Sequence, residues 1–258
     1  MQVSTRYARF EAGGRVSYGI VDNGRLEELQ GGIFDPRQLT GRQFALDEVK
    51  LLAPCEPPKV LAVGQNYISH LGERKTPKNP EMFYKPITSL QNPSGPIEIP
   101  ADAEDVHYEG ELVVVMGQTV RNASREEAAA AVFGVTCGND VSDRNWQRGA
   151  GKDVQWWRAK GCDTFAPLGP VIVTELDYSN LLLTTRLNGA VVQQQRTSDL
   201  IFDVPTVISF ISRYLTLTPG DVIYTGTPGN TGPMRPGDVV EVEIEGIGTL
   251  RNPVVREA

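Results

Sequence analysis

The stretch from His107 to Val115 constrains the fold of this chain more than any other. Its second half is a run of leucine and valines, which is typical of a buried β-strand. Side chains two residues apart on a strand point to the same face, so Glu109 and Glu111 share a face with His107. Because adjacent carboxylates repel each other, we expect a positive group between them, and a divalent cation is the first candidate.

Asp140 is the best candidate for a third ligand of this cation. It ends a predicted strand roughly thirty residues further on, which leaves room for a helix that returns the chain beside the first strand. Three carboxylates without an obligatory cysteine or histidine suit Mg²⁺ or Mn²⁺, with Ca²⁺ as a further option. Two alternatives stay open: an acidic strand face exposed to solvent, and a zinc site that includes His107.

His70 and Glu73 form a second candidate pair, for which a purely structural contact is the alternative. On a helical turn they would share a face, where the carboxylate fixes the imidazole tautomer and leaves the other ring nitrogen as a base. Lys160 is either functional or one of the surface lysines that most proteins carry. The segment 225–232 predicts either a backbone cradle for an anion or a plain turn, and it lacks the lysine of a P-loop.

Turn residues divide the chain into two parts. Residues 2 to about 30 predict a β-meander, and the proline cluster 54–58 predicts a boundary between a small N-terminal β domain (1–57) and a larger domain (58–258). Ser124 and Asp203 each begin a predicted helix, and 74–100 predict a long irregular loop over the site. Strands do not alternate regularly with helices, so the predicted fold class is β-rich α+β, built as a mixed β-sandwich roll.

Composition argues against several classes of function. The net charge is -7, with 25 basic and 32 acidic residues, which argues against a general nucleic-acid binder. No apolar run approaches the roughly 18 residues that cross a bilayer, and the first seven residues lack the apolar core of a signal peptide. We therefore expect a cytoplasmic protein with no membrane partner. The three cysteines are too few and too widely spaced for a disulfide framework or a zinc pattern.

Several motifs follow one another in the order of a known family. They are residues 64–67 with His70 and Glu73, then 83–86, 108–112, 138–142, 160–170 and 225–228. On these motifs the region from residue 59 to the end resembles the fumarylacetoacetate hydrolase family. Residues 1–55 resemble the small N-terminal domain that many bacterial members carry. The resemblance implies a mixed β-sandwich roll, usually a homodimer, that holds Mg²⁺ or Mn²⁺ on Glu109, Glu111 and Asp140.

The resemblance also implies roles for the other candidates. His70 and Glu73 would be an acid–base dyad on a segment that orders over the substrate, and Lys160 would polarise a carbonyl or enolate oxygen. The substrate-binding residues that it implies are Lys85, Arg144, Gln147 and Thr227. Asp143 and Asn145 depart from the usual alanine and aspartate of the family pattern, and we expect them to change the polarity of the pocket.

Members of this family act on small β-diketo or 2-oxo acids. Because the dyad can activate water, the resemblance favours metal-dependent hydrolysis of a C–C bond in an acylpyruvate-like or fumarylacetoacetate-like acid. The alternative is decarboxylation or keto–enol isomerisation of a 2-oxo dicarboxylic acid, such as one like oxaloacetate or 2-hydroxyhepta-2,4-diene-1,7-dioate. A catalytically silent member is disfavoured because the ligands, the dyad and the lysine are all present.

Overall fold

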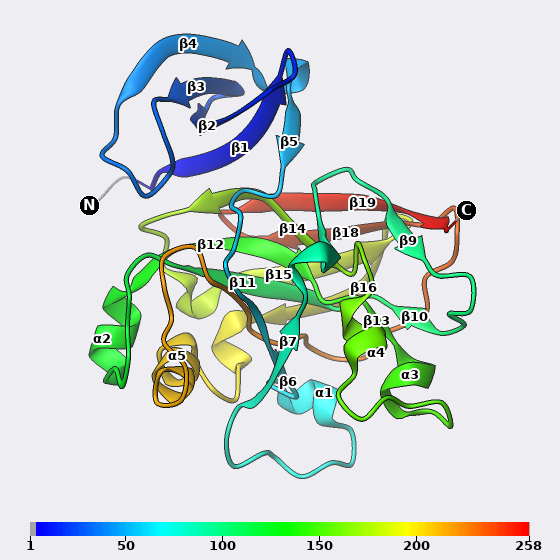
Figure 1. Cartoon of the computed structure of the whole chain (residues 1–258). Helices are drawn as coiled ribbons and strands as arrows, with labels where there is room; N and C mark the ends of the chain where they lie inside the picture. The colour runs from blue at the N-terminus through cyan, green and yellow to red at the C-terminus, as the bar shows by residue number, and fades with distance from the viewer. Residues whose placement is uncertain (1–3, 258) are drawn as a thin grey trace.

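The computed structural model describes residues 4–257. Strands hold 43% of the residues and helices 16%, so the β-rich prediction is confirmed. The N-terminal strands form a small β domain at the top of Figure 1, above the larger body that holds all the α-helices. In the described part of the chain, no helix is long and apolar enough to span a membrane.

The predicted β-meander is confirmed in the N-terminal domain. Its hairpins turn at Gly13-Gly14 and Asn23-Gly24, where all four residues have positive φ, the backbone that such two-residue turns require. The first strand also pairs with the larger body, where Tyr7 lies opposite Ile172. The strands of this domain are β1 (Arg6–Ala12), β2 (Arg15–Asp22), β3 (Arg25–Leu29), β4 (Leu39–Ala45) and β5 (Lys50–Leu52).

The larger body packs two sheets against each other, as a sandwich requires. The central sheet runs in the order β4-β3-β2-β1-β14-β12-β11-β17-β6-β7, and β8 pairs with β14. Its remaining strands are β6 (Val60–Gly64), β7 (Glu81–Lys85), β8 (Leu90–Gln91), β11 (Gly110–Met116), β12 (Val132–Asn139), β14 (Ala166–Val173) and β17 (Val222–Tyr224). The second sheet is β16 (Ala190–Arg196), β15 (Leu182–Leu187), β18 (Val239–Ile244), β19 (Gly248–Arg256) and β9 (Ile97–Ile99).

Short helices pack around this sandwich. Both predicted helix starts are confirmed: Ser124 makes both bonds of a capping box, and the Asp203 carboxylate accepts from the Thr206 N–H at 3.0 Å. The α-helices are α1 (Ile68–Leu71), α2 (Arg125–Ala130), α3 (Arg144–Arg148), α4 (Trp157–Gly161) and α5 (Val204–Ser212). The 3₁₀ helices are η1 (Leu46–Glu48), η2 (Ile87–Ser89), η3 (Tyr178–Asn180) and η4 (Thr197–Asp199).

Strand β11 is the central element of the core. Every one of its residues is buried, and alternate side chains enter two different apolar clusters, as strand geometry demands. Leu112 and Val114 pack in the cluster shared with the second sheet and helix α5, whereas Val113 and Val115 pack on the opposite face. Burial on both faces explains the unbroken apolar run and holds the start of β11 rigidly.

Two expectations from the sequence are wrong in detail. The region 74–100 is not an irregular loop, because β7, β8 and β9 within it pair with β6, β14 and β19. The predicted strand from His107 is also interrupted at residues 108 and 109. Its first part is β10 (Val106–His107), which leaves the central sheet and pairs with β13 (Ser142–Asp143).

Candidate active site

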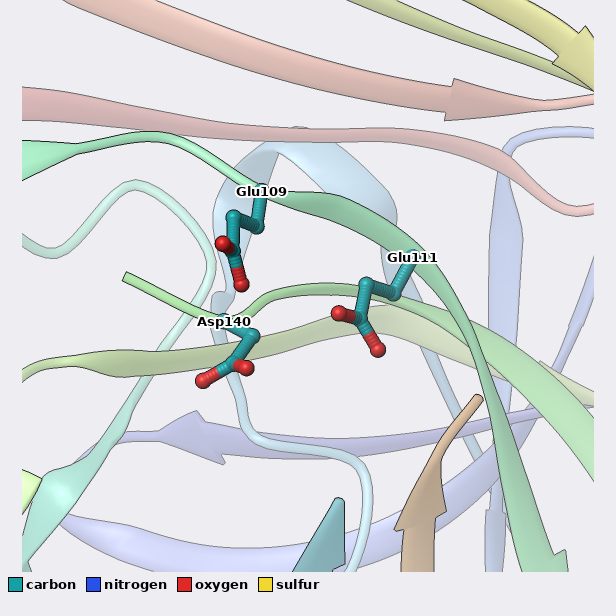
Figure 2. Close-up of side chains that lie close together, drawn as sticks. All are labelled: Glu109, Glu111 and Asp140. Carbon is teal, nitrogen blue, oxygen red and sulfur yellow. The ribbon is translucent and has the colours of Figure 1, made fainter. Parts of the chain in front are cut away.

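Three carboxylates meet where β11 begins and β12 ends. Gly110 lies opposite Asn139 in the register, and the Asp140 N–H donates to the Glu109 carbonyl at 2.9 Å. This pairing brings ligand atoms of Glu109, Glu111 and Asp140 within 4.8 Å of one another, with all three residues buried (Figure 2). The predicted acidic triad therefore exists, and a solvated strand face is excluded.

His107 does not share the face of the triad, so that part of the prediction is wrong. The break after β10 ends the strand alternation on which it relied. The Nε2 atom of His107 lies 2.8 Å from Asp105 Oδ1, and its Nδ1 lies 2.9 Å from Thr231 Oγ1. With both ring nitrogens engaged, His107 does not suit a zinc ligand, and it is not part of the triad.

Three buried cations surround two of the carboxylates. Lys160 Nζ lies 2.6 Å from Glu109 and 2.5 Å from Asp140, and Arg144 also pairs with Glu109. Lys85 Nζ lies 2.6 Å from Asp140. Among residues 4–257, Glu111 has no such partner, and its carboxylate accepts only the Gly226 N–H, at 2.7 Å.

The protonation of the two glutamates reflects this unequal pairing. Burial raises the pKa of Glu111 well above its usual range, and the nearby charges of Asp140 and Glu109 raise it further. Burial acts on Glu109 in the same direction, but Arg144 and Lys160 outweigh it and hold the pKa of Glu109 well below its usual range. Glu111 is thus a buried carboxylate without a cation, and three oxygen donors of this kind fit Mg²⁺ or Mn²⁺.

Lys85 lies behind the triad. Its side chain is fully buried, and besides Asp140 it donates to the carbonyl oxygens of Val141 and Lys160. It is not among the residues that line the cavity in front of the carboxylates. The structure therefore places Lys85 as a buried support of Asp140.

His70 faces the cavity from α1, but Glu73 does not accompany it. The helix ends at Leu71, and Gly72 (φ 59°, ψ −124°) turns the backbone so that Glu73 is exposed to solvent. His70 Nδ1 instead lies 2.7 Å from the Gly229 carbonyl oxygen. The predicted one-face pairing of His70 and Glu73 is therefore absent from the described structure.

The contact with Gly229 fixes the tautomer of His70. A carbonyl oxygen only accepts hydrogen bonds, so Nδ1 carries the proton and Nε2 is left with a free lone pair. Burial lowers the pKa of His70, although Glu109 acts in the opposite direction. The imidazole is consequently neutral at pH 7 and can accept a proton at Nε2.

The segment 225–232 is neither a plain turn nor an anion cradle open to solvent. Its Gly226 N–H binds the chain's own Glu111, and the Thr227 hydroxyl donates to the Gly110 carbonyl at 2.9 Å. A third contact comes from Gln193, whose amide donates to Thr227 at 2.8 Å. The segment therefore fixes the start of β11 and the orientation of His70 together.

A cavity of about 100 Å³ is lined by two carboxylates of the triad, Glu109 and Glu111. A wider hollow of about 860 Å³ beside it shares Phe83 and Trp156 but none of the three carboxylates, so we place the site in the smaller one. The cavity brings together the following residues predicted from the sequence: His70, Glu109, Glu111, Arg144, Gln147, Lys160 and Thr227. Arg74 and Arg148 also line it and were missed.

Asp143 and Asn145 lie outside this lining, so their departures from the family pattern do not set pocket polarity directly. Asp143 is fully buried and caps α3 by accepting the Trp146 N–H at 2.9 Å. Its other oxygen accepts the N–H groups of Glu104 and Asp105, each at 3.2 Å. Asp143 thus holds the loop that carries Asp105, the hydrogen-bond partner of His107.

Comparison with sequence families matches most of the chain. The family described as fumarylacetoacetate (FAA) hydrolase C-terminal matches residues 59–255. A second family, described as Rv2993c-like, N-terminal, matches residues 5–54.

Individual relatives match over most of the chain. Protein Rv2993c of Mycobacterium tuberculosis is 47% identical over 87% of this chain and 85% of its own length. The oxaloacetate tautomerase fahd2 of Xenopus laevis is 41% identical over 80% of this chain and 69% of its own length.

Two solved structures share the fold of this chain. The 5-carboxymethyl-2-hydroxymuconate delta-isomerase of Mycobacterium smegmatis has 45% identity and a TM-score of 0.90, covering 98% of this chain and 100% of its own. The maleylpyruvate hydrolase of a Sphingobium species, solved with manganese(II) and pyruvate, has 30% identity and a TM-score of 0.81 over 98% and 100% of the two chains.

Proposed function

The chain belongs to the fumarylacetoacetate hydrolase family, and on that premise we propose that it is a divalent-metal-dependent keto–enol tautomerase of small 2-oxo acids. The observation that carries this proposal is the state of His70. Its Nδ1 proton is held by Gly229 and its Nε2 is free, which suits movement of a single proton. Glu73, which would help to activate a water, lies in solvent.

This proposal replaces the preference for C–C hydrolysis with its alternative. The isomerase and tautomerase relatives have 45% and 41% identity to this chain, against 30% for the maleylpyruvate hydrolase. Hydrolysis stays the second candidate because Glu73 lies on the same segment as His70 and would complete a dyad if that segment folded inward.

The residues of the cavity suggest how the proton moves. Mg²⁺ or Mn²⁺, held by Glu109, Glu111 and Asp140, would supply Lewis-acid stabilisation of an enolate oxygen. Lys160 and Arg144 bring positive charge to the same cavity, where charge that develops on that oxygen is stabilised. Nε2 of His70 would take a proton from C3 of the keto form and give that proton to the oxygen on C2. In the reverse direction it would carry the proton from that oxygen back to C3, so one base serves both directions.

The proposal is tested by following enol disappearance by ultraviolet absorbance with oxaloacetate and acetylpyruvate, in the presence of Mg²⁺ or Mn²⁺. We expect Glu73→Gln to keep tautomerase activity within a factor of about 2–3, because the exposed side chain touches nothing in the site. Cleavage of acetylpyruvate to acetate and pyruvate, lost in Glu73→Gln, would instead establish the hydrolase.

A series of side-chain hydrogen bonds orients Arg144 and leads to a further prediction. Asp105, His107 and Thr231 bond in series, and Thr231 Oγ1 accepts from Arg144 at 2.8 Å. Thr231→Val should lower kcat/KM about tenfold, because Arg144 loses one charged hydrogen bond and its fixed orientation.

The control for this variant is Thr136→Val. Thr136 is fully buried in strand β12, and its hydroxyl has no partner among the described residues, so the substitution removes no hydrogen bond. In the double variant, His107→Leu should add little to the loss of kcat/KM caused by Thr231→Val, since both substitutions interrupt the same series of hydrogen bonds. Fully additive losses in the double variant would contradict a shared positioning role.

We also propose a homodimer, as the family resemblance implies. Strand β7 lies at the open edge of the central sheet, where an unpaired backbone can take a partner. Tyr84 on this strand is 63% exposed, and Trp157, which lines the wider hollow together with Tyr84, is 68% exposed. Light scattering of the purified protein measures the oligomeric state.

A further inference from the structure

Three arginines converge on the cavity, two of which the proposed chemistry does not use. Arg144 and Arg148 lie four residues apart on α3, so their side chains share one face of the helix. Arg74 reaches the same cavity from the segment that follows α1. Like charges at this helical spacing repel each other, so an anion bound at Arg148 would relieve that repulsion.

The described residues do not supply that anion. Arg144 is occupied by Glu109, Gln147 and Thr231. Neither Arg74 nor Arg148 forms an ion pair within residues 4–257. Burial and then the charges of Arg144 and Arg74 lower the pKa of Arg148, which agrees with crowding of positive groups.

Arg74 is already oriented for binding. Its Nε and one terminal nitrogen donate to the carbonyl oxygens of Leu71 and His70, at 2.9 and 2.8 Å. A guanidinium has five N–H donors, so its other terminal nitrogen keeps donors for a ligand. Because the guanidinium is tied to the His70 carbonyl, an anion bound to Arg74 would also hold the segment that carries the proposed base.

The charges of the side chains in the inner part of the site balance without these two arginines. Its three carboxylates, Glu109, Glu111 and Asp140, face three cations, Lys85, Lys160 and Arg144. Arg74 and Arg148 are therefore excess positive charge at the outer, solvent-exposed part of the cavity. A ligand that fits this pattern carries a second anionic group at the end remote from its 2-oxo acid group.

We propose that Arg74 and Arg148 bind the distal carboxylate of the substrate and make the site selective for 2-oxo dicarboxylates over 2-oxo monocarboxylates of equal length. The inference rests on the proposed function for the orientation of the substrate, with its 2-oxo acid end at the triad. Bidentate contact with planar guanidinium groups is the geometry that carboxylates prefer.

The kinetic test compares oxaloacetate with acetylpyruvate, in which an acetyl group replaces the distal carboxylate. In Arg74→Gln and Arg148→Gln we expect kcat/KM for oxaloacetate to fall about 10–100-fold, mainly through KM, as loss of a charged hydrogen bond predicts. The value of kcat/KM for acetylpyruvate should change by less than about threefold. The matched control is Lys152→Gln, an exposed cation four residues beyond Arg148 that does not line the cavity.

A binding measurement separates this inference from the proposed function. Malate and 2-hydroxybutanoate have equal length and cannot tautomerise, so calorimetry with the metal-loaded protein reports recognition alone. We expect wild type to bind malate at least about tenfold more tightly than 2-hydroxybutanoate. The Arg74→Gln/Arg148→Gln variant should lose this preference. Equal binding of both acids by wild type, or a preference that survives in the variant, would overturn the inference. Absence of tautomerase activity overturns only the proposed function.

Discussion

Glu111→Gln is expected to abolish metal binding while the metal-free protein keeps or gains stability. Among the described residues Glu111 has no cationic partner, and its pKa is raised by burial and by the neighbouring carboxylates. Glutamine preserves the shape and still accepts the Gly226 N–H, but it removes a buried negative charge that is repelled by its neighbours. The gain in stability should grow as pH rises above the ordinary carboxyl pKa of 4.5, because the raised pKa makes the proton of Glu111 harder to lose in the folded than in the unfolded chain.

Metal content after dialysis, measured by mass spectrometry, tests the first half of this prediction. We expect affinity for Mn²⁺ to fall by more than about 100-fold, beyond the cost of losing an outer partner of a ligand. Thermal unfolding in the presence of a chelator tests the second half. A normal metal content in Glu111→Gln would remove Glu111 from the ligand set.

Asp140→Ala is the matched comparison, because it should also lose the metal but with the opposite effect on stability. It leaves Lys85 and Lys160 buried without their shared carboxylate. Breaking a buried ion pair by removing one partner costs about 3–5 kcal/mol of the free energy of unfolding. Opposite shifts in melting temperature, together with the same loss of metal, would identify Glu111 as the carboxylate reserved for the cation.

Local signals in the sequence were sufficient for much of this site. The turn residues of the N-terminal meander, the caps at Ser124 and Asp203 and the apolar run of β11 act over a few residues, and each predicted its element. The meeting of Asp140 with Glu109 followed from the predicted return of the chain beside β11. These features depend on backbone propensity and hydrophobic pattern, which a single sequence contains.

The features that the sequence did not predict depend on long-range pairing. Strands β8 and β9 have two and three residues, and they exist because β14 and β19 lie beside them. His107 left the triad face because β10 pairs with β13 instead of continuing β11. Two local signals were nevertheless available: Gly72 ends α1 before Glu73, and the arginines of α3 share one face.

His70→Asn is expected to lower kcat about 10²–10⁴-fold, the usual range for a general base, while metal content stays normal. Asparagine places its amide nitrogen where Nδ1 lies, so the bond to Gly229 persists and the segment keeps its position. The side chain lacks any counterpart of Nε2, so only the proton-accepting atom is lost. The measurement is the rate of enol-to-keto conversion at saturating metal.

The pH profile of wild type adds an independent check on the same group. Because burial lowers the pKa of His70, the neutral base persists to lower pH, and activity should fall only as pH drops below the ordinary value of 6.5. This acidic limb should be absent in His70→Asn and present in Glu73→Gln, since Glu73 is exposed to solvent and is not among the charges that shift the pKa of His70. Full activity in His70→Asn would exclude His70 as the base. Equal losses in both variants would show that Glu73 joins His70 during turnover, which favours the hydrolase over the tautomerase.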